Sequence, residues 1–104
     1  MNVEEFAKFV INNMTRATLS NALNICVKLD NDEYYKFTDF INAIYAYISD
    51  ILNTDNKNIE INKIYEILVV SNKYLKMYES NIKYNKNMII DCYIIDLWEI
   101  LNGH

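Results

Sequence analysis

The chain has 104 residues, of which 52% are hydrophobic and 23% are charged, and this balance indicates one folded domain over residues 1–104 rather than a disordered segment. Proline is absent and Gly103 is the only glycine, whereas a β-rich domain uses both residues to reverse its chain. The formal net charge of −4 argues against a domain whose main role is to bind a phosphate backbone. No apolar run approaches the roughly 20 residues that span a bilayer. No secretory signal opens the chain either, so a soluble protein of the cytoplasm is expected.

The first half of the sequence predicts three helices separated by polar breaks. Asn2 and Glu5 have the spacing of a capping box, and apolar residues then recur every three to four positions, which predicts a helix that ends near residue 15. A second helix is predicted over residues 16–29. Asp30-Asn31-Asp32 is a polar break, and its last residue is expected to cap a third helix over residues 33–53. The apolar stripe of this third helix is wide, which indicates neighbours on two sides.

The second half predicts two more helices, so the expected fold class is all-α, a compact bundle of about five helices. Residues 54–58 form a polar loop, and residues 59–61 lead into a helix from a cap at Asn62 to about residue 84, rather than forming a short strand. Asn85-Lys86-Asn87 interrupts the pattern, and the last helix covers residues 88–101 before a stop at Gly103. Two adjacent faces of this last helix are apolar, which is typical of a helix at the centre of a bundle or at an interface.

Residue types that perform catalysis or bind metals are scarce and scattered. The only histidine is His104, at the end of the chain, and a single glycine cannot build a phosphate-binding loop. Asp91 and Asp96 diverge by roughly 140° around a helix, and Asp96 and Glu99 share a face without a basic partner. We therefore expect no enzyme activity, no catalytic residue, no metal site and no cofactor.

The two cysteines, Cys26 and Cys92, each fall beside aliphatic positions that are expected to face inward. A disulfide between them is the alternative. We predict that both thiols are reduced and mostly buried, where they act as small hydrophobic residues.

Lys73, Lys76 and Lys83 lie near one face of the fourth predicted helix, with tyrosines nearby, and are the best candidates for a contact with nucleic acid. The alternative is an ordinary solvated helix face, because Glu79 interrupts the basic residues. Together with the acidic net charge, this alternative makes nucleic acid a poor candidate for the direct ligand.

Several aromatic and aliphatic positions indicate a surface that binds another protein. Tyrosine buries a ring while keeping one polar end, which suits interfaces, and the third helix carries Tyr45 and Tyr47. On the last helix, Ile89, Ile95 and Trp98 form the second apolar face, which a small bundle often leaves at its surface. We predict that these five residues contact a partner, with Trp98 as the main anchor. The alternative is that Trp98 closes the core of the bundle.

The C-terminal stretch combines three features in order. Asn85-Lys86-Asn87 forms a corner after a long helix, Asp91 is an acidic residue in the helix that follows, and Ile94, Ile95 and Leu97 are aliphatic positions around it. This pattern resembles the end of the delta-prime subunit in the clamp loader of bacterial DNA polymerase III. The aromatic helix over residues 40–52 is similar as well, so the resemblance covers about residues 35–101 and does not place residues 1–30.

This resemblance implies a collar domain, a helical domain that joins equivalent domains of other clamp-loader subunits in a ring during DNA replication and has no catalytic role. It implies other clamp-loader subunits as partners, with no small-molecule substrate and no membrane. The main alternative is a small helical phage or viral protein that binds and inhibits a host protein.

Overall fold

The regular structure of the chain is helical. The computed structural model describes residues 1–54, 59–80 and 85–103, and over these ranges it contains helices and no strand, so the all-α prediction is confirmed. The elements in chain order are α1 (Val3–Met14), α2 (Leu19–Leu23), α3 (Ile25–Leu29), the 3₁₀ turn η1 (Asp30–Asp32), α4 (Phe37–Leu52), α5 (Ile61–Glu79) and α6 (Lys86–Leu101).

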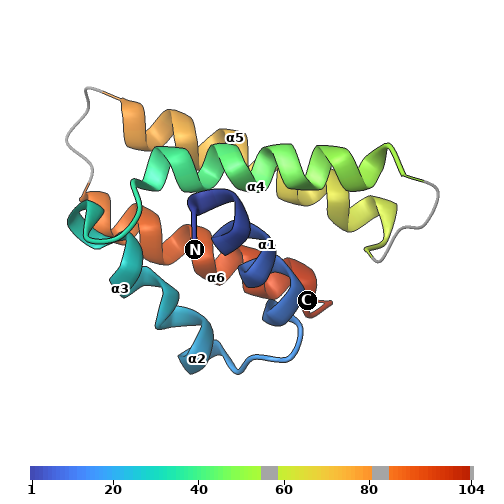
Figure 1. Cartoon of the computed structure of the whole chain (residues 1–104), viewed down its shortest axis with the longest axis horizontal. Coiled ribbons are helices and arrows are strands. Elements are labelled where there is room, and N and C mark those ends of the chain that lie inside the picture. The colour runs from blue at the N-terminus through green and yellow to red at the C-terminus, as the bar shows by residue number, and fades with distance from the viewer. Residues whose placement is uncertain (55–58, 81–84, 104) are drawn as a thin grey trace.

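Two long helices, α4 and α5, run antiparallel and side by side (Figure 1). α1 packs on α4, whereas α6 packs on α5 and also contacts the short helices α2 and α3. α6 is therefore covered by neighbours on more than one side, as expected for a helix that is apolar around much of its circumference.

Two helix starts follow the signals in the sequence. Asn2 Oδ1 accepts from the Glu5 N–H at 2.8 Å and the Glu5 carboxylate accepts from the Asn2 N–H at 3.3 Å, so the predicted capping box is confirmed. Asn85 Oδ1 accepts from the N–H groups of Asn87 and Met88 at 3.0 and 3.3 Å. The predicted break at residues 85–87 is therefore the N-cap of α6, which begins at Lys86, slightly earlier than expected.

The prediction of one continuous helix over residues 16–29 is wrong, because two short helices, α2 and α3, occupy this stretch. Thr18 Oγ1 accepts from the Asn21 N–H at 3.2 Å and caps α2, which ends before Asn24, and α3 begins directly after Asn24. Asparagine is a weak helix former because its side chain competes for backbone hydrogen bonds. Ala22 on α2 and Cys26 on α3 both lie in the core, as residues four apart on one helix face would.

The predicted cap at Asp32 is also wrong, because α4 begins only at Phe37. Asp32 has a φ of 58°, in the left-handed region that aspartate enters more readily than most residues. The N–H groups of Tyr34 and Tyr35 then both donate to the Lys28 carbonyl at 3.2 Å. These bonds tie the segment back to α3 and delay the start of the next helix.

α5 begins at Ile61 with Glu60 as its N-cap, so the predicted cap at Asn62 is wrong and lies two residues too late. Ile59 and Glu60 lead into the helix, Ile61 is its first residue, and these three residues form no strand. α5 ends at Glu79, because its C-cap Ser80 has an extended backbone, so the predicted continuation of this helix to about residue 84 is wrong from Ser80 on. Residues 81–84 themselves and most of the predicted loop at 54–58 lie outside the described residues.

The core is centred on Tyr93 of α6, which is fully buried. Its ring centroid lies 5.7 Å from that of Phe37, 6.5 Å from that of Phe40 and 5.7 Å from that of Tyr74. The Tyr93 hydroxyl lies 2.6 Å from Oγ of Ser71, which is also fully buried. Burial raises the pKa of Tyr93, so its hydroxyl keeps its proton for this hydrogen bond. The cluster joins α4, α5 and α6.

Asp30, the first residue of η1, occupies an unfavourable place for a carboxylate. Its Oδ1 atom is buried and has no hydrogen-bond partner in the described part of the chain. Burial raises the pKa of Asp30, and the negative charges of Asp91 on α6 and of Glu33 raise it further. The folded chain therefore holds this proton more tightly than the unfolded chain, and ionisation of Asp30 opposes folding.

Asp30→Asn is expected to raise the free energy of unfolding at neutral pH. The gain is on the order of 0.5 kcal/mol, because solvent screens a partly exposed charge. The gain should shrink as the pH falls through the raised pKa of Asp30 towards its ordinary value of 3.8, where wild-type Asp30 is neutral too. Urea unfolding at neutral and acidic pH measures this, with Asp50→Asn on the exposed face of α4 as the control. A gain of the same size at both pH values would contradict the prediction.

Candidate functional site

Trp98 lies near the C-terminal end of α6 and is partly buried against the core. Its indole N–H donates to the Ala17 carbonyl at 2.8 Å, in the segment between α1 and α2. One turn later, Asn102 Nδ2 donates to the Met14 carbonyl at 3.3 Å and to the Trp98 carbonyl at 2.8 Å. Side chains at the end of α6 thus donate hydrogen bonds to the end of α1 and to the segment that precedes α2. Trp98 therefore makes intramolecular contacts, in agreement with the alternative that it closes the core of the bundle.

The predicted second apolar face of α6 is not a continuous exposed surface. Ile89 is only 4% exposed and belongs to the core, so the expectation that it remains at the surface is wrong. Ile95 is partly exposed, and Trp98 is engaged as described. The physical reason is that α5 covers one side of α6 while α2 and α3 cover another.

The two tyrosines predicted on the third helix differ in their surroundings. Tyr47 is partly buried, its hydroxyl donates to Asn12 Oδ1 at 3.0 Å, and Lys8 Nζ lies 5.8 Å from its ring centroid. This tyrosine joins α4 to α1. Tyr45 is 46% exposed and lies beside a small groove between α4 and α5. Of the two, Tyr45 is the more accessible to a partner.

A regularly spaced apolar surface lies on α5, and the sequence analysis missed it. Ile61, Tyr65 and Val69 are 49%, 53% and 66% exposed. Their spacing of four residues places them along one face of the helix. Tyr65 and Val69, together with Glu66, Val70 and Ile100, line a groove of about 350 Å³ between α5 and α6. We call these five residues the α5–α6 groove.

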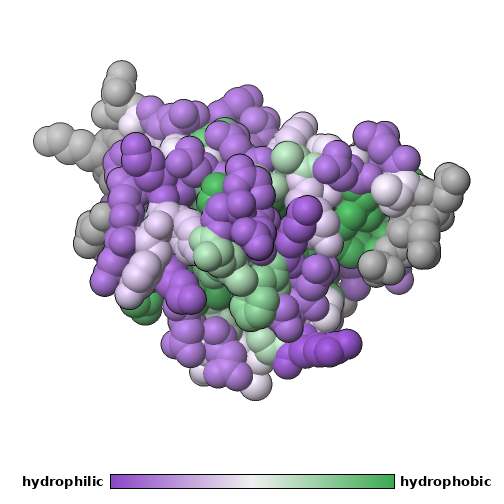
Figure 2. All heavy atoms as spheres, in the orientation of Figure 1, coloured by the Kyte–Doolittle hydropathy of each residue, from purple (hydrophilic) through white to green (hydrophobic). Residues whose placement is uncertain are grey.

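Other exposed apolar residues are more isolated. On the face drawn in Figure 2 hydrophilic side chains predominate, and hydrophobic atoms gather over α1 and beside the ends of α4 and α5 on the right. Phe9 on α1 and Val27 on α3 are 54% and 57% exposed. Single exposed apolar side chains are common on soluble domains. The spacing along α5 is what sets the α5–α6 groove apart.

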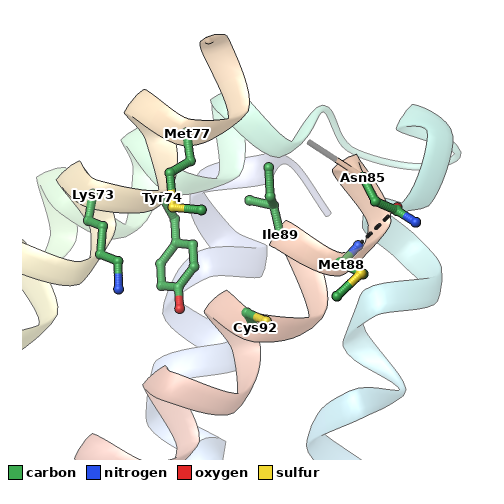
Figure 3. Close-up of a pocket in the computed structure, with 7 residues that line it drawn as sticks. All are labelled: Lys73, Tyr74, Met77, Asn85, Met88, Ile89 and Cys92. Carbon is green, nitrogen blue, oxygen red and sulfur yellow. Dashed lines mark hydrogen bonds between the residues drawn. The ribbon is translucent and has the colours of Figure 1, made fainter. Parts of the chain in front are cut away.

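The predicted basic face is only partly described. Lys73 and Lys76 are exposed on α5, and Lys83 lies outside the described residues. Lys73 Nζ lies 5.0 Å from the centroid of the Tyr74 ring. Lys73 also lines a cavity between α5 and the start of α6 (Figure 3).

Both cysteines are free, but only one is buried. Cys26 is 5% exposed, and burial, a hydrogen bond to Asp91 and nearby negative charge raise the pKa of its thiol to about 12. It is therefore an uncharged, unreactive thiol at neutral pH. Cys92 is exposed, so the prediction that it is buried is wrong. It lies at the rim of the cavity in Figure 3 rather than in the core.

The carboxylates of α6 serve separate contacts. Asp91 accepts the hydrogen bond from Cys26, whereas Asp96 Oδ2 accepts from the Tyr74 hydroxyl at 2.5 Å. Burial raises the pKa of Tyr74, and this hydrogen bond raises it further. Within the described ranges, no group of three or more histidine, cysteine, aspartate or glutamate side chains is placed to hold a metal ion.

None of the helices in the described part of the chain is both long enough and apolar enough to cross a membrane. No family model matches the chain, and no curated protein or solved structure is significantly similar to it.

Proposed function

We propose that this chain is a non-catalytic assembly domain that binds another protein through the α5–α6 groove. The observation that carries the proposal is the exposure of Tyr65 and Val69 above an apolar groove that Ile100 completes. Contiguous exposed apolar surface on a soluble domain marks contact sites, and tyrosine is enriched in protein interfaces. Ile61 extends the same face of α5 by one turn.

In its more specific form, the proposal is that the partners are other subunits of a clamp loader. The support is the resemblance of residues 35–101 to the collar domain of a delta-prime subunit. The corner of that pattern falls at residues 85–87, where Asn85 caps α6, the last helix. A collar domain assembles through its helices, and the α5–α6 groove offers apolar helical surface for such a contact.

The test compares two substitutions that introduce the same charge at similarly exposed valines. Val69→Asp alters the α5–α6 groove, whereas Val27→Asp alters α3, and these positions are 66% and 57% exposed. Sedimentation velocity with candidate clamp-loader subunits measures assembly of the full chain. Val69→Asp is expected to weaken assembly by about 2 kcal/mol or more, while Val27→Asp leaves it unchanged.

Two results would count against the proposal. If both folded variants assemble like the wild type, the α5–α6 groove is not the contact surface. If the wild-type chain does not associate with any of those subunits, the clamp-loader form of the proposal fails, and a host protein of a phage or virus becomes the next partner to test.

A further inference from the structure

The cavity between the second half of α5 and the start of α6 has the character of a side-chain pocket (Figure 3). Its lining residues are Lys73, Tyr74, Met77, Asn85, Met88, Ile89 and Cys92. Its volume is about 200 Å³, which is below the roughly 300–1,000 Å³ of small-molecule sites. A space of this size suits one or two side chains better than a cofactor.

The walls of the cavity are apolar and adaptable. Ile89 and the ring of Tyr74 form walls on α6 and α5 (Figure 3). Met77 and Met88 add flexible thioethers, and Met88 is 61% exposed at the start of α6. Methionine adjusts its shape to different apolar partners, which is why it is common at surfaces that bind several ligands. The occupant is therefore expected to insert an aliphatic or aromatic side chain.

One lysine, Lys73, lines the cavity and places a positive charge at its rim. Lys73 contacts the Tyr74 ring and makes no ion pair within the described residues. Lys76 is exposed almost one turn further along α5. Lys86, the first residue of α6, lies 4.3 Å from the centroid of the Tyr78 ring and donates to the Tyr78 carbonyl at 3.2 Å.

The carboxylates of α5 and α6 belong to Glu66, Glu79, Asp91, Asp96 and Glu99, and none of them lines the cavity. Asp96 accepts the hydrogen bond from the Tyr74 hydroxyl at 2.5 Å and does not line the cavity. Glu79 is exposed at the last position of α5. The cavity therefore combines an apolar interior with a lysine ammonium at its edge.

We infer that this cavity binds a partner segment in which a hydrophobic side chain stands next to a carboxylate. The hydrophobic side chain enters between Met77 and Ile89, and the carboxylate meets the Lys73 ammonium at the rim. This inference goes beyond the α5–α6 groove, because the two surfaces share no lining residue. A segment of this chemistry also differs from nucleic acid, which brings phosphates to the lysines but no aliphatic side chain to the cavity.

The test uses N-acetyl-leucine as the probe and N-acetyl-leucinamide as its uncharged counterpart, titrated into the ¹⁵N-labelled full chain. Amide shifts are expected to cluster at Lys73, Met77, Ile89 and Cys92 and to saturate. The acid is expected to bind about two- to fivefold more tightly than the amide, because one exposed ion pair changes an affinity by about this factor. Lys73→Gln should abolish this preference, whereas Lys63→Gln, which removes the same charge near the start of α5, should keep it.

Cys92→Phe, which fills the cavity from its exposed rim, should remove binding of both probes without changing the fold seen in the spectrum. Shifts that do not saturate, or that lie elsewhere on the chain, would overturn the inference. Equal affinity for the acid and the amide would overturn the role of Lys73. A single-stranded oligothymidine that competes with N-acetyl-leucine and shifts the Lys73 and Lys76 amides would assign this surface to nucleic acid instead.

Discussion

Trp98→Ala is expected to lower the free energy of unfolding by about 3 kcal/mol, near the lower end of the range for large aromatic residues because this ring is only partly buried. The substitution removes the ring that packs against the core and leaves the Ala17 carbonyl without its donor. Trp98→Phe keeps most of the packing but loses the hydrogen bond, so it should cost less, about 1 kcal/mol for the bond itself.

The effect is expected to be large because side chains at the end of α6 hydrogen-bond both to the end of α1 and to the segment before α2. The Met14 carbonyl at the end of α1 accepts from Asn102, and the Ala17 carbonyl accepts from Trp98. The Met14 carbonyl also accepts from the Ala17 N–H at 3.3 Å, so the bonds from Asn102 and Trp98 fix one turn of the chain at the end of α1 against α6. Loss of Trp98 therefore weakens the attachment of α1 and α2 together.

Urea unfolding followed by circular dichroism measures this prediction, since Trp98 is the only tryptophan and its removal abolishes the tryptophan fluorescence. Phe9→Ala, at an aromatic residue on α1 that is 54% exposed, is the control and should change stability little. If Trp98→Ala unfolds like the wild type, Trp98 does not close the bundle. A folded Trp98→Ala chain that fails to bind a partner would instead support the anchor role predicted from the sequence.

Local signals in the sequence located the starts of α1 and α6. The capping box of Asn2 and Glu5 and the break at Asn85 depend on side chains that bond to the backbone within three residues, so spacing reveals them. The late start of α4 depends on Tyr34 and Tyr35 donating to Lys28. The split at Asn24 separates α2 from α3, and both short helices pack on α6. Such contacts are set by packing, and helical periodicity does not encode them.

Surface residues were harder to predict for a related reason. α6 is apolar around much of its circumference, so its pattern does not reveal that Ile89 faces the core while Cys92 faces solvent. On α5, Ile61, Tyr65 and Val69 have regular helical spacing, which could have revealed the exposed face. The inner face of that helix already accounted for its amphipathic pattern, and only the packed structure shows which apolar face lacks a neighbour.

A second large effect is expected at the buried pair of Ser71 and Tyr93. Ser71→Ala leaves the Tyr93 hydroxyl in the core without its partner, because both side chains are fully buried and their oxygens lie 2.6 Å apart. An unsatisfied buried polar group costs about 1–3 kcal/mol. Tyr93→Phe should cost less, because a serine hydroxyl within a helix can donate to the carbonyl one turn earlier, here that of Ile67.

The double variant, Ser71→Ala with Tyr93→Phe, separates the hydrogen bond from the packing. Because both polar groups are then absent and the ring volume is kept, its cost should be smaller than the sum of the two single costs, with a coupling of about 0.5–3 kcal/mol. Urea unfolding of the wild type, the two single variants and the double variant gives all four free energies. Strictly additive costs would show that the hydroxyls act independently despite their short separation. In that case the cluster around Tyr93 would be stabilised by its contacts with Phe37, Phe40 and Tyr74 alone.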